Sequence, residues 1–543
     1  MRLSHFVAVL SSAVLASAGP TSPQDAFHEV LTLQPLPDGK LSVLFEFTTH
    51  FSLHKGDGPS QSHHSLTPPT LLLPLEKSNV SELTISFTSG QWNQLRHGES
   101  GPPAYEAGGG GGEVRGWLEG GDTDTAWDDV THAFAGLFCA TVGAEHVGES
   151  VRTFGDLYPP ARQGNNLSHY LVASPHLHLC TENLTPFLSL LPSKGLSGLS
   201  ALLAHPGNVL GWGFKTEGID VVMPSKTQQG TWTGWWGGVV DLVPERGGTR
   251  GFTLKTIFGT NLPRPFPKAA SSTLRLIAPE GGLAVDPAPQ KVNKRWVDGR
   301  RREVAEWDLF TEDLQDKDFG FWWHEEGPFK HPLHFEPPAV TISRVAADRH
   351  ASDATFVVNI ANNADVDREA VYSEVWPWWV KGWLSEMSVK VNGAAAPDLI
   401  HSIDYHPSTP PTPSTTDLHL RLTLPARSTV QLSIPFTKLT LKYDDHVPDA
   451  ERGREIPASV LTLLDVKGEE ERYADKALET GTVDVQRTSR RRVYGPKLLL
   501  DVPTPDFSMP YNVIIMSSTV MAVFFGSIQG RIIRRWGWVE ASK

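Results

Sequence analysis

The chain has very little cysteine: Cys139 and Cys180 are the only two in 543 residues. Two cysteines form at most one internal disulfide, which excludes a small secreted scaffold held together by disulfides. Basic residues are also in the minority, with 48 Lys and Arg against 61 Asp and Glu and a net charge of −13. We therefore expect a fold stabilised by apolar burial, and no nucleic acid among its partners.

The motifs of common enzyme classes are absent as well. The sequence contains no phosphate-binding loop and no dinucleotide fingerprint. Ser197 lies in Gly-Leu-Ser-Gly-Leu, where Leu199 replaces the second glycine of a nucleophile elbow. His176 and His178 form an H-x-H pair on one face of a predicted strand, but no third ligand has zinc-site spacing. We expect no catalytic set, no metal and no cofactor.

The first residues, MRLSHFVAVLSSAVLASAGP, predict a secretory signal peptide. Arg2 supplies the positive start, Phe6 to Leu15 the apolar centre, and Ala16-Ser17-Ala18 the small-residue cleavage site. The apolar centre is too short to cross a membrane. We expect residues 1–18 to be removed and the remainder to enter the secretory pathway.

A second apolar stretch, from Tyr511 to Gly530, contains no charged residue. As a helix it would rise ~30 Å, at ~1.5 Å per residue, which is enough to cross a hydrocarbon core. Arg531, Arg534 and Arg535 follow directly and predict a cytosolic tail, residues 531–543. The chain is therefore predicted to be a single-pass type I membrane protein with a transmembrane helix at 511–530.

Two alternatives concern this span. A removable GPI-attachment signal would end in its hydrophobic tail, whereas 13 residues with three arginines follow here. A lone anchor in the thin ER bilayer is the other alternative. Ser517, Ser518 and Thr519 favour a helix that packs against partner helices, because hydroxyl side chains form hydrogen bonds between helices.

Period-two alternation dominates the body of the chain. Residues 29–51 contain an apolar run, a Pro-Asp-Gly-Lys turn and a second alternating run, which predicts a β-hairpin. We expect an all-β-dominated body of antiparallel, sandwich-like domains with a few helices. Further strands are predicted at 81–89, 238–243, 273–278, 339–345, 354–360, 387–393, 418–424 and 429–436.

Two stretches have helical periodicity. Trp127, Val130 and Phe134 predict a helix within 124–143, in which Cys139 would be a small buried residue. Residues 185–203 predict a second helical stretch that is broken at Pro192.

Glycine and tryptophan are clustered. The glycine-rich segment 106–121, EAGGGGGEVRGWLEGG, predicts a flexible surface insertion. Trp235-Trp236 and Trp378-Trp379 are adjacent pairs flanked by Gly or Pro. Because both members of a pair cannot readily face one core, we expect at least one of each pair to meet a partner or lipid headgroups.

The body is too long for a single hydrophobic core. The chain becomes rich in proline and charge between about residues 259 and 338, so we place a domain boundary near Pro337. The prediction is an N-terminal lumenal β-rich domain at 19–337 and a C-terminal lumenal β-sandwich domain at 338–505.

Three Asn-x-Ser/Thr sequons, at Asn79, Asn166 and Asn183, fit a lumenal body. Pro186 directly follows the third sequon and should hinder glycan transfer. We predict glycans on Asn79 and Asn166 and none on Asn183.

Cys180, in HLCTENLTPF, has three possible roles. A nucleophile would need an activating histidine, and the sequence around Cys180 lacks the local signatures of cysteine proteases. A bond to Cys139 would close a loop of about 40 residues and stabilise the fold by ~3–4 kcal/mol on the loop-entropy account. An exposed, unpaired cysteine in an oxidising compartment would instead bond to another chain.

The C-terminal stretch LLLDVPTPDFSMPYNVIIMSSTVMAVFFGSI closely resembles the signature of the phosphatidylinositol glycan class T (PIG-T) family, a subunit of GPI transamidase. Its most specific part is Pro503 to Ile514. ELTISFTSGQW, GLFCAT, CTENLTPF and LPARSTVQLSIPF are further family-like stretches. The resemblance runs from near residue 27 to the end of the span.

This resemblance implies a non-catalytic scaffold and stabilising subunit in the endoplasmic reticulum membrane. In the family complex a caspase-like subunit cleaves the proprotein and joins it to a GPI lipid, and the PIG-T subunit is disulfide-linked to that subunit. The family cysteine in CTENLTP maps onto Cys180, which is thereby predicted to form the interchain disulfide. Ser193 stands where animal relatives carry another cysteine. The alternative is an independent type I glycoprotein or cargo receptor that binds ligands through its β-sandwiches.

Overall fold

The computed structural model describes residues 25–542 apart from 53–64, 99–108, 141, 143–149, 154–156, 158–159, 161–165, 226–227, 244–247, 279–281, 298–299, 315–316, 325–326, 349, 351, 409–413, 443–444, 447–451, 465–490, 505–507 and 535–536. The predicted signal peptide, residues 1–18, lies outside the described residues.

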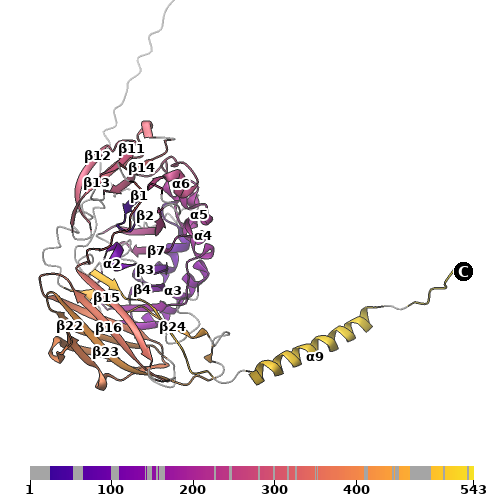
Figure 1. The fold of residues 1–543 in the computed structure, drawn as a ribbon. Coiled ribbons are helices and arrows are strands. Elements are labelled where there is room, and N and C mark those ends of the chain that lie inside the picture. The colour runs from indigo at the N-terminus through magenta and orange to yellow at the C-terminus, as the bar shows by residue number, and fades with distance from the viewer. Residues whose placement is uncertain are drawn as a thin grey trace, which may run out of the picture.

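One eleven-stranded sheet organises the N-terminal part of the chain (Figure 1). β1 pairs with β10 in parallel, and the other neighbouring strands are antiparallel. In spatial order the strands are β12 (Lys291–Val297), β13 (Arg300–Asp308), β10 (Ser271–Ile277), β1 (Ala26–Pro35), β2 (Lys40–Phe51), β8 (Gly230–Asp241), β7 (Phe214–Val222), β3 (Val80–Ser89), β4 (Gly111–Glu119), β6 (Leu167–Ser174) and β5 (Ser150–Thr153). A small sheet of β11 (Leu283–Asp286), β14 (Gly320–Trp323) and β9 (Gly251–Thr253) accompanies it.

The predicted hairpin is confirmed as β1 and β2. The turn is closed by a hydrogen bond from the Leu36 N–H to the Lys40 carbonyl at 2.8 Å, and Gly39 takes a positive φ of 84°. Apolar side chains of β2 such as Val43 and Phe45 are buried in the main core, as their alternation predicts.

Helices cover one face of this sheet (Figure 1). The predicted helix at 124–143 is confirmed as α3 (Thr123–Phe138), and Trp127 on it stacks on Tyr170 of β6. The second helical stretch begins earlier than predicted, as α4 (Thr181–Leu190), and breaks at Pro192 into short 3-10 turns. The remaining covering helices are α1 (Pro69–Lys77), α5 (Pro206–Val209) and α6 (Leu254–Phe258).

The C-terminal part is a sandwich of two sheets with its own core (Figure 1). Phe356 and Phe436 stack in this core with ring centroids 3.9 Å apart. The six-stranded sheet contains β15 (Val340–Asp348), β16 (Asp353–Asn362), β23 (Ser428–Lys438), β19 (Ser388–Val391), β20 (Ala394–Ala395) and β18 (Val380–Gly382). The five-stranded sheet contains β21 (Ile400–His406), β22 (Thr416–Leu424), β17 (Arg368–Trp376), β25 (Val460–Leu463) and β26 (Arg491–Tyr494), and β24 (Arg454–Ile456) pairs with β27 (Leu498–Leu500).

The predicted strand-dominated fold class is therefore confirmed. The layer that packs against the sheet differs between the two parts of the chain. The N-terminal sheet is covered by helices, whereas the C-terminal sheets cover each other. Buried apolar residues form two large separate clusters, one from residues 27–321 and one from residues 340–502.

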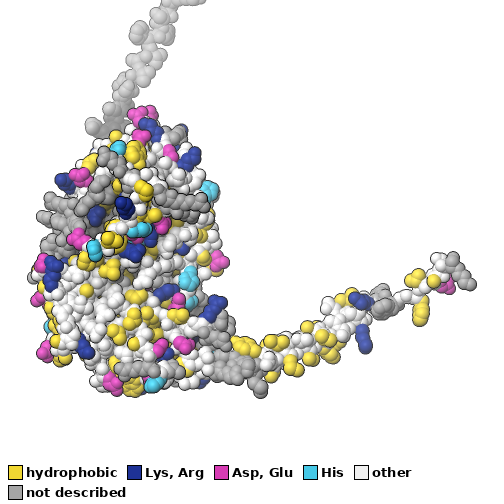
Figure 2. Space-filling view, viewed as in Figure 1, with side chains coloured by type: hydrophobic (Ala, Val, Ile, Leu, Met, Phe, Trp, Pro, Cys, Tyr) yellow, Lys and Arg dark blue, Asp and Glu magenta, His cyan; other side chains and the backbone are white. Residues whose placement is uncertain are grey.

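The predicted apolar span is confirmed as a single helix, α9 (Ser508–Ile533). Its segment Tyr511–Ile533 has a mean hydropathy of 1.7 and is long and apolar enough to cross a membrane. The helix projects away from the body, and its surface is largely hydrophobic (Figures 1 and 2). This geometry fits a single-pass membrane protein.

The prediction of a flexible insertion at 106–121 is wrong for residues 111–119. These residues form β4, a buried strand between β3 and β6. Its glycines permit close packing: a Cβ on Gly112 would lie 2.7 Å from Leu177, and one on Gly116 would lie 2.9 Å from the Glu82 carbonyl oxygen. A glycine run that resembles a linker in composition here provides space for neighbouring chain segments.

The expectation for Trp235-Trp236 is also wrong, because both side chains are buried. β8 lies inside the sheet, and its two faces are both covered: Trp236 packs against Trp212 on the helix-covered side, while Trp235 fills the space above Gly218. In the second pair, Trp379 is buried and Trp378 is partly exposed.

Candidate disulfide tether at Cys180

Cys180 is the N-cap residue of α4, with extended backbone angles of φ −142° and ψ −173°. The residues before it do not form the strand that the H-x-H pattern predicted: β6 ends at Ser174, and a turn and coil lead to Cys180. The Leu179 N–H donates to the Ser89 hydroxyl at 2.7 Å and anchors this approach to β3. His176 and His178 are exposed on it.

Asn183 fixes the position of Cys180. Its Oδ1 accepts hydrogen bonds from the Cys180 N–H at 3.2 Å and from the Cys180 Sγ at 3.4 Å. Its Nδ2 donates to the Phe138 carbonyl at 2.9 Å, and the side chain is buried. One amide therefore connects the start of α4 to the end of α3.

Cys139 follows the last residue of α3, and the prediction that it is buried is wrong. The helix ends at Phe138, and Cys139 takes the left-handed conformation with φ 51° and ψ 41°. In this conformation its side chain leaves the packed face of the helix, and Cys139 is exposed. Helical periodicity placed it inside because the sequence did not reveal that the helix stops one residue earlier.

Both cysteines are free thiols near the junction of α3 and α4. Cys180 is half-buried, and Cys139 is more accessible. The polar partner of the Cys180 Sγ is an amide oxygen, which is not a base that could activate a nucleophilic thiol.

Asn79 and Asn166 are exposed and lie at the same end of the sheet. The Glu119 N–H donates to the Asn79 carbonyl at 3.0 Å, and the Gly120 N–H donates to the Asn166 carbonyl at 3.5 Å. Asn166 also donates from Nδ2 to the Gly120 carbonyl at 2.5 Å. The two sequons thus flank the end of β4, although they are far apart in sequence.

The structural role of Asn183 was missed by sequence reasoning. The available signal was the Cys-Thr-Glu-Asn pattern, in which an N3 side chain reaches back to the N-cap N–H as in a capping box. The described part of the chain contains no group of three or more His, Cys, Asp or Glu residues that could hold a metal ion.

Comparison with known proteins identifies the family. The family model described as "Gpi16 subunit, GPI transamidase component" matches residues 6–250 and 245–543, nearly the entire chain. The chain belongs to the Gpi16 family. The resemblance noted in the sequence is thereby confirmed, and this Gpi16-family chain is a GPI transamidase component by family.

Curated relatives match the sequence of this chain over most of their own length. The chain is 26% identical to "GPI-anchor transamidase component PIGT" of Homo sapiens, covering 94% of this chain and 91% of that protein. It is 25% identical to "GPI transamidase component GPI16" of Saccharomyces cerevisiae, over 95% of this chain and 89% of the yeast protein. The "GPI transamidase component PIG-T homolog" of Schizosaccharomyces pombe is 28% identical over 88% of this Gpi16-family chain and 84% of its own length.

Proposed function

We propose that this chain is a non-catalytic scaffold and stabilising subunit of GPI transamidase in the endoplasmic reticulum membrane. Family membership over nearly the whole chain carries the proposal. In this proposal residues 1–18 are the signal peptide, and residues 19–337 and 338–505 are two lumenal domains. The arginines after the span keep residues 531–543 in the cytosol. Its partners are the caspase-like catalytic subunit and the other membrane subunits.

The proposed covalent link to the catalytic subunit is a disulfide at Cys180. The half-exposed thiol at the start of α4 supports it, as does the position of Cys180 in the family-like stretch CTENLTPF. Asn183 holds the backbone of Cys180 in place, so the thiol is presented from a fixed point on the body.

We further propose glycans on Asn79 and Asn166, and none on Asn183. Exposure of the first two side chains supports glycan addition there. Asn183 is buried, so its Nδ2, the atom that would carry the glycan, is not accessible for glycan transfer. Asn79→Gly and Asn166→Gly each remove a sequon, and glycine readily adopts the positive φ of these positions. Each variant should therefore migrate on a gel with an apparent mass lower by one glycan. Thr185→Ala removes the third sequon on an exposed residue and should change nothing.

The tether is tested by the full chain expressed with its complex and analysed on non-reducing gels. Cys180→Ser removes the thiol while serine remains a favoured N-cap residue, so α4 should persist. We expect a covalent heterodimer from the wild type that is absent in Cys180→Ser and retained in Cys139→Gly. Loss of the heterodimer in Cys139→Gly alone would refute the assignment to Cys180.

The scaffold role is tested separately by co-purification from ER membranes. A scaffold should arrive with a constant set of multi-spanning partners, whereas a cargo receptor would not. Replacement of 511–530 by polyleucine should preserve insertion and loosen the complex, because it removes the hydroxyl and small side chains that pack between helices. Full recovery of the complex would mean that the span is only an anchor.

A further inference from the structure

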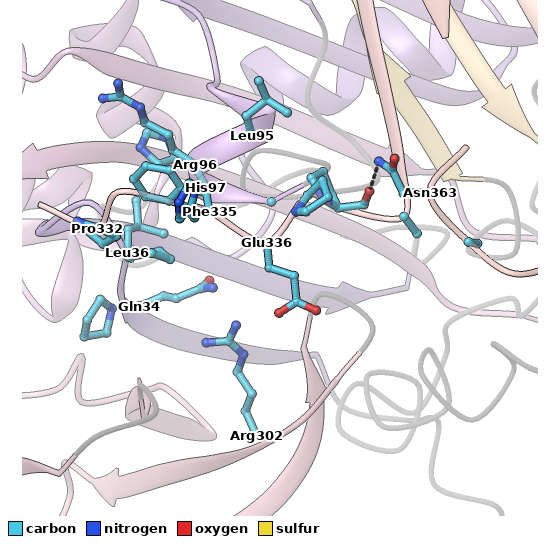
Figure 3. A pocket seen from close by; sticks show the side chains of 18 of the residues that line it. Gln34, Leu36, Leu95, Arg96, His97, Arg302, Pro332, Phe335, Glu336 and Asn363 are labelled. Carbon is cyan, nitrogen blue, oxygen red and sulfur yellow. Dashed lines mark hydrogen bonds between the residues drawn. The ribbon is translucent and has the colours of Figure 1, made fainter. Parts of the chain in front are cut away.

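A cleft of about 840 Å³ lies between the N-terminal sheet and the C-terminal sandwich. Its walls come from the turn after β1, from α2 (Gln94–His97), from β13, from residues 329–338 and from residues 363–368 of the sandwich. Figure 3 shows that side chains from these separate segments converge on one space. This volume is in the range of known small-ligand pockets.

Cationic side chains outnumber acidic ones in the lining. They are Arg96, Arg250, Arg302, Lys330, Arg368 and Arg491, against the carboxylates Glu336 and Asp365. Asp365 is already paired with Arg427, whose Nε lies 2.7 Å from its Oδ1 and lowers its pKa. The cleft is therefore strongly positive in a chain whose net charge is −13.

Aromatic rings hold two of these cations in position. Arg250 lies 4.0 Å from the ring centroid of Trp323 and 4.3 Å from that of Phe329. Arg96 lies 5.6 Å from that of Phe335. A cation–π contact of this kind restrains a guanidinium group while its N–H groups stay able to donate to an oxyanion.

The wall that carries Arg96 is itself fixed. His97 Nε2 lies 2.9 Å from Oδ2 of the buried Asp38, and the Trp92 ring packs against His97. Burial would raise the pKa of Asp38, but the hydrogen bond and charge of His97 together with Lys40 lower it. Asp38 is thus held as an anion that anchors the short helix α2 beside the cleft.

Arg302 enters from β13 on the opposite side, and Figure 3 shows it directed toward Glu336 across the cleft. The Nε of Arg302 is buried and has no hydrogen-bond partner within the described chain. None of the described carboxylates forms an ion pair with Arg96, Arg302 or Lys330. A buried donor without an acceptor is costly, and an anionic ligand would supply one.

The lining also favours a compact oxyanion over an extended acidic peptide. A peptide is recognised largely through main-chain hydrogen bonds, which require N–H donors on the walls. Five of the lining residues are prolines and have no such donor: Pro35, Pro37, Pro332, Pro337 and Pro338. The prolines reduce the number of main-chain donors, whereas the charged side chains of the lining match the oxygens of a phosphate group.

We propose that this cleft is a phosphate-binding site between the two parts of the body. Its ligand is a phosphate group, either on a soluble phosphorylated compound or on a phospholipid headgroup. The site goes beyond the proposed scaffold role and does not depend on the disulfide.

The test uses the purified full-length chain in detergent and isothermal titration calorimetry. Inorganic phosphate and inositol phosphate are the soluble probes, and phosphatidylinositol phosphate in mixed micelles, compared with phosphatidylcholine, is the lipid probe. We expect wild-type binding and a loss of about tenfold or more in affinity for Arg302→Gln and for Lys330→Gln, as removal of a charged hydrogen bond predicts.

Lys294→Gln is the matched control, because Lys294 is an exposed residue of β12 outside the cleft and makes only a long 3.9 Å contact to Glu303. It removes the same charge and should leave the affinity unchanged. Lys330 is exposed, so its variant should fold even if Arg302→Gln does not.

Stronger binding of the soluble probes would support a soluble ligand, and stronger binding of the micellar lipid would support a headgroup. Three results would overturn the proposal: no phosphate binding by the wild type, equal effects of Lys330→Gln and Lys294→Gln, or binding of an acidic peptide without binding of any phosphate probe.

Discussion

Glu374 in the C-terminal sandwich and Glu217 in the N-terminal sheet are both completely buried, yet their surroundings differ. The Glu374 carboxylate lies 2.5 Å from the Arg344 guanidinium and also accepts hydrogen bonds from Tyr372 and from the Trp376 indole. Neither oxygen of Glu217 has a hydrogen-bond partner within the described residues. Glu217 lies between Phe87 and Trp236 on neighbouring strands of the main core.

Their titration reflects this difference. Burial raises the pKa of Glu374, and Arg344 with the surrounding hydrogen bonds opposes the shift. Burial alone raises the pKa of Glu217 well above its usual value. The sandwich thus surrounds its buried acid with compensating groups, whereas the N-terminal sheet gives Glu217 no such groups and its burial favours the protonated form over the charged one.

Arg344 also donates to the carbonyls of Pro457 and Pro496, at 2.6 and 3.0 Å, so the polar cluster connects three segments of the sandwich. Among the described residues no such polar cluster surrounds Glu217, and the buried Nε1 atoms of Trp235 and Trp236 have no hydrogen-bond partner there either. The difference teaches that a buried residue of the same type can connect segments in one part of the molecule and cost free energy locally in another part.

The largest expected effect follows removal of one member of the buried pair. Glu374→Leu leaves the Arg344 charge buried without its counterion, and we expect the free energy of unfolding of the sandwich to fall by about 3–5 kcal/mol. Denaturant titration followed by tryptophan fluorescence measures this. Arg344→Met with Glu374→Leu should recover most of the loss, and equal losses in the single and double variants would contradict the comparison.

The opposite sign is expected for Glu217→Met. A side chain of similar volume replaces a carboxyl group without partners, so the free energy of unfolding should rise by about 1–3 kcal/mol. The folded-state pKa of Glu217 is raised. Its contribution to the free energy of unfolding is therefore fully present below the ordinary pKa of 4.5 and is lost as the pH rises through the raised pKa.

The gain from Glu217→Met should therefore be larger above the raised pKa than below 4.5. Titration of Glu29 and Glu374 is common to both proteins and cancels in the difference. A gain that is independent of pH would show that Glu217 has its ordinary pKa in the folded chain.

A substitution with an expected effect of comparable size tests the close packing of β4 in the N-terminal sheet. The Cβ of Gly116→Ala would lie 2.9 Å from the Glu82 carbonyl oxygen and 3.2 Å from the Trp127 ring, so we expect a loss of about 1–3 kcal/mol. In Gly121→Ala the Cβ would meet no atom within 4 Å, and thermal unfolding should change little. Similar melting temperatures for both variants would contradict the buried position of β4.

The smallest effect is expected at Cys139. Glycine adopts its left-handed conformation without the Cβ penalty, so Cys139→Gly should stabilise the end of α3 by about 0.5–1 kcal/mol. Thermal unfolding of the full chain measures this, with Cys139→Ala as the control that removes the thiol and keeps the strain. If the two variants are equally stable, relief of backbone strain is not the cause.

Features encoded locally were predictable from the sequence. The β1–β2 hairpin follows from alternation and a Pro-Asp-Gly-Lys turn, and α9 follows from an uncharged apolar stretch. The family followed from Pro503 to Ile514, and the comparisons confirm it. These signals need only neighbouring residues, because period and hydropathy are properties of a short window.

Other features depended on which segments pack together. Gly111–Glu119 became a buried strand because β3 and β6 lie on both sides of it, and Trp235 and Trp236 are both buried because both faces of β8 are covered. The sequence determined the strand-rich body, the apolar span and the family. Only the tertiary structure decided that Cys139 is exposed, that Asn183 holds Cys180 and that cations from distant segments share one cleft, because these positions are set by contacts between residues far apart in the chain.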